Sequence, residues 1–409
     1  MADDATDGGS GIGPASARKS RFVGKRTFAA VALVGALLLL AGLAAALVFY
    51  RDSGPSDPTL SAAVGAGDYL VRHTNADGSF VYEVDPVKGR VSAGYNILRH
   101  AGTSYAMLEL YEVTRDAALL GAAERALSYL EAQAQPCPDF PQTLCVVEDR
   151  EIKLGGNGLA VLAFAKHAEV TGNESHLGTA VKLARWMTAT QSRAGEFTKH
   201  RITTGGKPDE FISEFYPGEA LFALARLSVR TGNREWIEAA HRGAAWIINV
   251  RDRGKTTDQI ARDHWFLYAL NELHADRASA EYVAHARVIT EAIVMDQHQT
   301  QEGAQQDWNG GYGDPPRSTP AATRSEGLSA ALRIFRRAGD KEYERKALQA
   351  LERGIEFQLR TQMTAAKADE LHADAASIGG FHESLDEYGI RIDYVQHNLS
   401  ALLAYRSVR

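Results

Sequence analysis

Four acidic side chains stand at the expected starts of helices that are otherwise apolar, where they could act as acids and bases. They are Glu219, Asp263, Glu326 and Asp393. Two such carboxyl groups can hydrolyse a glycosidic bond, one as general acid and the other as nucleophile or as base for water. A separation of about 5–5.5 Å would indicate a retaining enzyme, and about 6.5–9.5 Å an inverting one. Glu219 could instead be an ordinary first-turn acid that the helix dipole favours, and Asp393 could simply pair with Arg391 or cap its helix.

Tyr394 directly follows Asp393 and offers a second kind of chemistry. An epimerase needs a base on each face of a carbon atom, and tyrosine can serve if neighbouring arginines lower its pKa. Hydrolysis and epimerisation therefore stay open, with Tyr394 and the four carboxylates as candidate catalytic residues.

Basic, polar and aromatic residues gather at the same helix ends. The arginines are Arg99, Arg262, Arg324 and Arg391. Guanidinium groups beside positive helix ends favour an anionic ligand such as a uronate, sulfate or phosphate group. The other candidate substrate-binding residues are Tyr95, His100, Asn157, Tyr216, Trp308 and His397. The two histidines could equally be hydrogen-bonded core residues.

If these helix ends converge, residues distant in sequence should line one cavity. We expect this of Arg99, His100, Tyr216, Glu219, Arg324, Asp393, Tyr394 and His397. Polar and aromatic groups at one end of an apolar barrel are typical of a ligand site.

A repeated helical unit would position these residues. Short turns at 114–116, 171–173, 231–233, 276–278 and 338–340 separate stretches with apolar residues at helical spacing. A single helix over 60–71 precedes the five pairs, and another over 392–406 follows them. The pattern predicts an all-α fold of twelve helices in six hairpins, an (α/α)6 toroid, in which the first and last helices pack together.

The connections between units are much longer than the turns inside them. They span about 75–94, 135–154, 193–213, 298–319 and 361–390. All lead into the inner helices, so they should crowd one rim, where long loops often carry function. A short β-hairpin is expected at this rim, pairing 79–84 with 90–92.

Glycine–aromatic pairs recur in the long connections, at 78–80, 195–197, 310–312 and 379–381, three of them after a glutamine. Each has a structural explanation, since glycine permits a sharp exit and the aromatic ring packs over the outer helix. As a set they resemble the repeats of two toroid groups, the six-hairpin glycosidase-like enzymes and the terpenoid cyclases. The ring contains no aspartate-rich cyclase motif, and it has no cysteine and histidine set like that of the lanthionine cyclases.

With the helix count and the acidic, aromatic rim, residues 58–409 resemble the six-hairpin (α/α)6 glycosidase-like superfamily. This group includes unsaturated glucuronyl hydrolases, sugar 2-epimerases and the C-terminal domain of glucuronyl C5-epimerases. Arg391-Ile392-Asp393-Tyr394, followed by His397, is similar to the closing-helix motif of the C5-epimerases, whose histidine lies one residue further on. The resemblance implies catalytic roles for Tyr394 and Glu219, and it does not extend to the β domains of that family.

The N-terminal segment predicts a membrane anchor. Residues 28–50 carry no charge and would form a helix of about 34 Å, long enough to span a bilayer. Five basic residues precede this segment, so we expect a disordered cytoplasmic tail over 1–26, an anchor over 27–50, a linker over 51–58 and an extracytoplasmic toroid over 59–409. A cleaved signal peptide is the alternative for the apolar segment.

The charge of the chain limits its classes of binding partner, and its two cysteines indicate a disulfide. Beyond residue 50 the chain has 40 basic and 48 acidic side chains, which argues against nucleic-acid binding. Cys137 and Cys145 share one connection, and outside the cytoplasm we expect them to form a disulfide. No metal site or cofactor is expected.

The sequence thus predicts a membrane-anchored, extracytoplasmic enzyme that acts on an acidic, uronate-type glycan by hydrolysis or C5-epimerisation. The alternative is a non-catalytic protein that binds a glycan or assembles envelope polysaccharide at the same rim.

Overall fold

The computed structural model describes residues 57–207, 210–299 and 306–409. The predicted tail, the anchor and most of the linker lie outside the described residues. No helix in the described part of the chain is long and apolar enough to cross a membrane.

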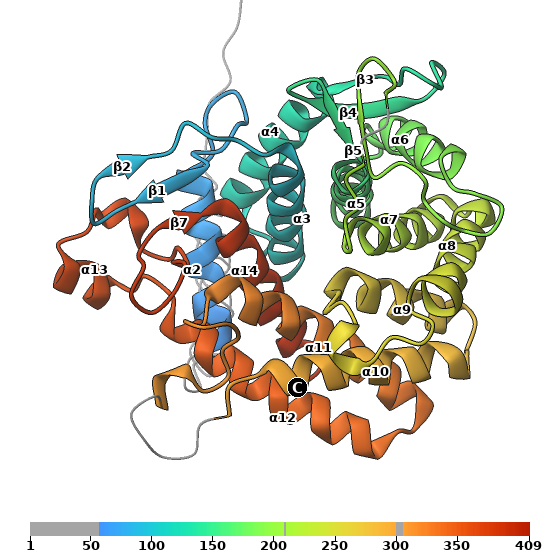
Figure 1. Ribbon diagram of the computed structural model, residues 1–409. Helices are drawn as coiled ribbons and strands as arrows, with labels where there is room; N and C mark the ends of the chain where they lie inside the picture. The colour runs from blue at the N-terminus through green and yellow to red at the C-terminus, as the bar shows by residue number, and fades with distance from the viewer. Residues whose placement is uncertain (1–56, 208–209, 300–305) are drawn as a thin grey trace, which may run out of the picture. The chain divides into compact units, whose positions relative to one another are not determined.

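Six inner helices form a closed ring in Asp57–Arg409 (Figure 1). They are α3 (Ile97–Thr114), α5 (Leu154–Thr171), α7 (Tyr216–Thr231), α9 (His264–Asp276), α11 (Ser318–Ala338) and α14 (Ile392–Arg406). Each packs against the next in this order, and α14 packs against α3.

Six outer helices surround this ring. They are α2 (Pro58–Arg72), α4 (Ala117–Ala132), α6 (Leu177–Ala189), α8 (Arg234–Trp246), α10 (Ala280–Asp296) and α12 (Lys341–Arg360). The first helix, α2, packs against the last, α14, so the expected ring closure is confirmed. A short helix, α13 (Ala365–Leu371), is added in the last rim connection.

Turn residues end one helix and begin the next. Gly172 and Gly232 take the left-handed conformation that closes a helix C-terminus, while Arg115 does so at an energetic cost. The next helix is then capped by a side-chain oxygen, as where Asp116 accepts a hydrogen bond from the Leu119 N–H at 2.8 Å. Ser279 caps α10 in the same way.

The glycine–aromatic repeats have a structural role, because hydrogen bonds fix them to the outer helices. Gln191 Nε2 donates to the carbonyl oxygens of Gly195 and Ala239 at 3.1 and 3.0 Å, which ties the loop to α8. Gln297 and Gln362 make the corresponding pair of bonds in their own units. Gly195 has φ +105°, and a Cβ there would overlap the Arg242 carbonyl oxygen. Backbone packing therefore explains the repeat.

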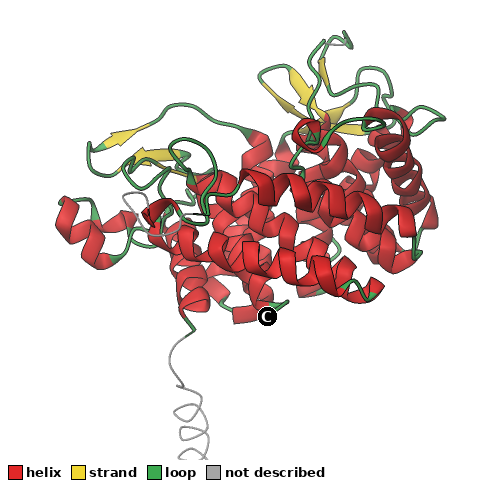
Figure 2. Cartoon of the chain, turned by 60° about the horizontal axis from the view of Figure 1, so that its bottom comes forward, coloured by secondary structure: helices red, strands yellow, loops and turns green. Residues whose placement is uncertain are grey.

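Two small antiparallel sheets lie on one rim (Figure 2). The first joins β1 (Glu83–Asp85), β2 (Arg90–Val91) and β7 (Ile390–Arg391), so the expected hairpin forms and gains a strand that leads into α14. The second has the order β3 (Ala134–Pro136), β4 (Leu144–Glu148), β5 (Glu151–Lys153), β6 (Arg201–Thr203), and was not predicted. A disulfide joins Cys137 to Cys145 beside β3 and β4.

Ion pairs link the inner helices at the end away from this rim. Lys166 on α5 lies 2.6 Å from Glu112 of α3 and 3.1 Å from Glu169 of its own helix. Arg226 on α7 pairs with Glu169 and with Glu272 of α9. Charged side chains thus bridge the inner helices here, whereas the N-terminal ends surround a cavity.

Candidate active site

A cavity of about 430 Å³ opens at the N-terminal ends of the inner helices. All six inner helices contribute to it, and its volume is within the usual range of small-molecule sites. Seven of the eight residues expected to meet here line it: Arg99, Tyr216, Glu219, Arg324, Asp393, Tyr394 and His397.

Glu219 is a buried acid in the first turn of α7. Its Oε2 has no hydrogen-bond partner in the described part of the chain, and a Cβ at Gly155 would overlap this oxygen. Burial, and then the charge of Asp263, raise the pKa of Glu219 well above its usual value. Burial therefore favours the protonated form of Glu219, which can donate a proton.

Asp263 lies behind the cavity wall. It caps α9 by accepting the Phe266 N–H at 3.0 Å, and its side chain is fully buried against the backbone of Gly218. Burial raises its pKa to about 7. Asp263 does not line the cavity, so it acts on a ligand only through its neighbour Glu219.

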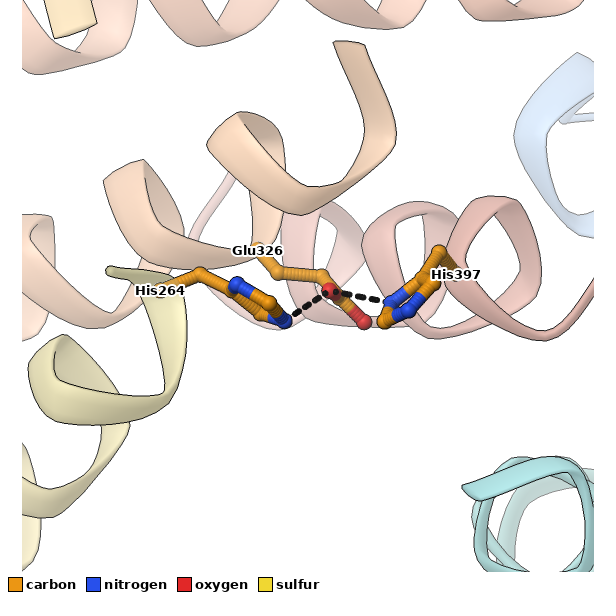
Figure 3. A group of neighbouring side chains, drawn as sticks. All are labelled: His264, Glu326 and His397. Atoms are coloured by element: carbon orange, nitrogen blue, oxygen red, sulfur yellow. Dashed lines mark hydrogen bonds and ion pairs between the residues drawn. The ribbon is translucent and has the colours of Figure 1, made fainter. Parts of the chain in front are cut away.

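Glu326 of α11 lies between two histidines from different helices (Figure 3). Its Oε2 accepts a hydrogen bond from His397 Nδ1 at 3.0 Å and lies 3.4 Å from His264 Nε2. Burial raises the pKa of Glu326 to about 7, although the charge of His397 opposes this shift. Burial and the charges of His397 and Arg324 lower the pKa of His264 well below its usual value. His264 is therefore neutral.

Asp393 is occupied by two arginines. Arg391 donates to its two oxygens at 2.6 and 3.1 Å, and Arg99 Nε lies 3.2 Å from Oδ2. The alternative structural role of Asp393 is thus the one observed. With both oxygens engaged, Asp393 is a poor nucleophile or base.

Tyr394 could serve as a base only if neighbouring arginines lowered its pKa, and this condition is not met. The Arg391 guanidinium lies 4.4 Å from the centre of its ring. Burial nevertheless outweighs that charge and raises the pKa of Tyr394 to about 12. The pKa of Tyr216 is also raised to about 12 by burial. Neither tyrosine is a ready base near neutral pH.

Arg324 is a half-buried cation in the wall of the cavity. Its guanidinium lies 5.5 Å from the Tyr312 ring centre and donates to Thr323 Oγ1 at 3.2 Å. Among the described residues, no carboxylate lies within ion-pair distance of Arg324, and its Nε has no acceptor. A ligand carboxylate would supply the missing partner.

Five of the expected binding residues lie elsewhere. His100 is buried between Tyr95 and the Ala126 carbonyl oxygen, with hydrogen bonds of 2.7 and 2.8 Å, so both side chains are structural. Asn157 holds β4 by accepting the Val146 N–H at 3.0 Å. Arg262 precedes α9 and is ion-paired with Asp296 at 2.7 Å. Trp308 packs on His298 outside the cavity.

His264 and Trp265 also line the cavity, although neither is among the candidate catalytic or substrate-binding residues named from the sequence. They follow Asp263 directly, and the prediction took Arg262 and Asp263 as the first residues of the inner helix. The signal that could have found them is the cap itself, because an aspartate at the N-cap places the next two residues in the first turn. Trp265 packs against Tyr268 and the His397 ring, forming an aromatic wall.

Comparisons with solved structures show what fold this is. Cellobiose 2-epimerase from Bacillus thermoamylovorans B4167 superposes with a TM-score of 0.62 at 14% identity, covering 83% of this chain and 95% of that one. A D-mannose isomerase superposes with a TM-score of 0.61 at 14% identity, covering 87% of this chain and 100% of that one. An unsaturated glucuronyl hydrolase specific for heparin superposes with a TM-score of 0.56 at 15% identity, covering 86% of this chain and 98% of that one. These comparisons confirm the predicted (α/α)6 toroid fold.

No protein-family model matches the sequence, and no curated protein matches it.

Proposed function

We propose that this protein is an enzyme that epimerises a uronate residue of an acidic glycan at C5. One arrangement carries the proposal. Glu219 of α7 and His397 of α14 come from opposite positions of the six-helix ring and face one cavity. Arg324 also lines this cavity and has no carboxylate partner in the part of the chain that the structure describes.

The reaction needs two proton-transfer groups and one cation. The C5–H of a uronate lies next to its carboxylate, so its removal places negative charge on that group, and Arg324 would stabilise the charge. In the tautomer in which His397 Nδ1 donates to Glu326, Nε2 is the proton acceptor. Glu219 would give its proton to the opposite face of C5, forming the new C–H bond.

The state of the carboxylates favours epimerisation over hydrolysis. Hydrolysis needs a second, ionised carboxylate free to attack or to activate water, and Asp393 is held by two arginines. Solved structures with this fold include sugar epimerases and an isomerase as well as hydrolases. Hydrolysis is therefore an outcome that the experiment must distinguish.

The test is incubation with a glucuronate-containing polysaccharide in D2O. We expect deuterium at C5, seen by NMR, without new reducing ends. Glu219→Gln should slow this exchange by about 10²–10⁴-fold, because the amide cannot donate a carboxyl proton. Glu214→Gln, an exposed acid two residues before α7, is the matched control and should leave the rate unchanged.

New reducing ends without exchange would make the protein a hydrolase. Binding of the glycan with neither reaction would support the non-catalytic alternative.

We also propose that residues 27–50 anchor the ring outside the cytoplasm. The basic residues before this segment and the Cys137–Cys145 disulfide support this location, since disulfides persist in oxidising compartments. Protease added to spheroplasts, in which a periplasmic or a cell-surface domain is accessible, should cleave the rim loops. Protection of those loops, with digestion only after lysis, would contradict an outward orientation.

A further inference from the structure

We propose that His264, Glu326 and His397 bind one divalent transition-metal ion, of which Zn²⁺ is the best fit. Each residue offers one ligand atom, and these three atoms lie within 4.8 Å of one another (Figure 3). In the described part of the chain, no other group of three histidine, cysteine or acidic residues meets this geometry.

The spacing suits a small ion. Zn²⁺ binds histidine nitrogen and carboxylate oxygen at about 2.0–2.2 Å, which places tetrahedral ligand atoms about 3.3 Å apart. The Glu326 oxygen lies 3.0 Å from His397 Nδ1 and 3.4 Å from His264 Nε2. Two imidazoles and one carboxylate are a known three-ligand set for zinc, with the fourth position open.

Unpartnered polar atoms point independently to a ligand. Neither ring nitrogen of His264 has a hydrogen-bond partner among the described residues, although this residue is only 5% exposed. Glu326 is 1% exposed, and its Oε1 also lacks a partner. Buried polar groups normally have hydrogen-bond partners, so these unpartnered atoms support an ion that binds here.

The backbone holds the three ligands in place. Gly327 follows Glu326, and a Cβ there would lie 3.2 Å from the Cα of His264, so glycine lets α11 approach α9 closely. His397 stands on α14, which packs against α11. Ligands on three packed helices are positioned before an ion arrives.

The open coordination position would face the cavity, because His264 and His397 line it. Arg324 is near enough for its positive charge to act on His264. This charge would weaken the binding of any cation at the site. Nitrogen ligands then favour Zn²⁺ or Co²⁺ over Mg²⁺ or Ca²⁺.

One consequence rests on the proposed function. An ion on His397 Nδ1 and Glu326 would leave the ring proton of His397 on Nε2, so Nε2 could no longer accept the C5 proton. The bound ion should therefore inhibit epimerisation, and a chelator should restore it.

The experiment titrates the chelator-treated full-length protein with Co²⁺ and records its visible absorption, which reports coordination directly. We expect bands that saturate at one ion per chain and are displaced by Zn²⁺. His264→Gln and His397→Gln should each weaken binding by at least about 100-fold, since even partners outside the coordination shell change affinity by 10–100-fold. His176→Gln is the matched control, because His176 pairs with Glu131 at 2.8 Å on the outer layer but belongs to no such group.

Circular dichroism melting shows whether each variant is folded, and Glu326→Gln provides a third variant of the site. A folded wild-type protein without cobalt bands would overturn the metal site, as would bands that all three variants keep. Activation of C5 exchange by Zn²⁺ would overturn the inhibition. Saturable cobalt binding without any C5 exchange would leave the metal site standing and refute the proposed function.

Discussion

Under the proposed function, Arg324 is the residue that would bind the carboxylate of an acidic substrate. Its replacement by glutamine removes a half-buried cation that has no carboxylate partner among the described residues. Because hydrogen bonds to charged groups contribute about 1.5–3 kcal/mol, Arg324→Gln should lower kcat/KM for a uronate substrate by about 10- to 100-fold.

Arg317 serves as the comparison for this substitution. It also lines the cavity, but it is 58% exposed and lies 3.7 Å from Glu383, so Arg317→Gln should have a much smaller effect. Steady-state kinetics on one polysaccharide measure both. Equal losses in the two variants would mean that Arg324 has no special role in binding the carboxylate.

The residue types of the cavity were readable from the sequence, but their roles were not. Glu219 and Arg324 were found because they fall at helix starts, where inner helices converge. Whether a carboxylate is free depends on side-chain contacts, and the sequence could not decide between a reactive Asp393 and one held by Arg391 and Arg99. Likewise, only burial shows that Tyr394 has a raised pKa despite its neighbouring arginine.

At the scale of elements, the glycine–aromatic repeats and the hydrogen bonds from their glutamines hold the long loops to the outer helices. Gly195 and Gly172 both have positive φ, but only at Gly195 would a Cβ overlap backbone. Alanine at either position should cost about 1–2 kcal/mol for the left-handed conformation. Gly195→Ala should cost a further 1–3 kcal/mol or so for the overlap.

Urea unfolding of the two variants measures this difference. Equal stabilities of Gly195→Ala and Gly172→Ala would show that the loop can move away from α8 without cost.

Asp276, at the end of α9, makes stability depend on pH. Hydrogen bonds from Arg234 and then His241 lower the pKa of Asp276 to about 2. Because the folded pKa is below the unfolded one, this stabilisation is complete above about pH 4 and is lost as pH falls towards 2. Since Arg234 is well exposed, Asp276→Asn should cost only about 1 kcal/mol at pH 7, and less at pH 3.

Urea unfolding at both pH values gives the comparison, with the exposed Asp369→Asn as control. A cost for Asp276→Asn that is the same at pH 7 and pH 3 would contradict this account.

The helices were predictable because apolar periodicity and capping residues are local signals, and α14 begins and ends where expected. The sheet of β3 to β6 was not, because its strands are only three to five residues long and pair across the long connections. Short strands carry too little alternation to be distinguished from loop. The rim loops that shape the cavity were therefore the least predictable part of the fold.

At the scale of the whole ring, closure makes the two ends of the helical array neighbours. Asp57 lies 2.8 Å from Arg406 and 3.8 Å from Arg409, and Gln362 donates to the Ala62 carbonyl oxygen of α2 at 2.8 Å. The repeat count predicted this closure, because an even set of hairpins buries its last exposed face only by meeting its first. Because these contacts bring residue 57 close to residue 409, the two ends of the ring can be joined by a short linker.

A circular permutant of residues 57–409 tests the closed ring. Residue 57 is joined to residue 409 by a short glycine–serine linker, and new ends are opened at Gly172, in the exposed turn between α5 and α6. Because chain ends are tolerated at exposed turns, this permutant should keep the helical circular dichroism spectrum and unfold in one transition. A control opened after Ala163, in the buried middle of α5, should not fold. If the Gly172 permutant were unfolded while the unpermuted segment folded, the first and last helices could not be neighbours, and the shared cavity would have to be abandoned with the ring.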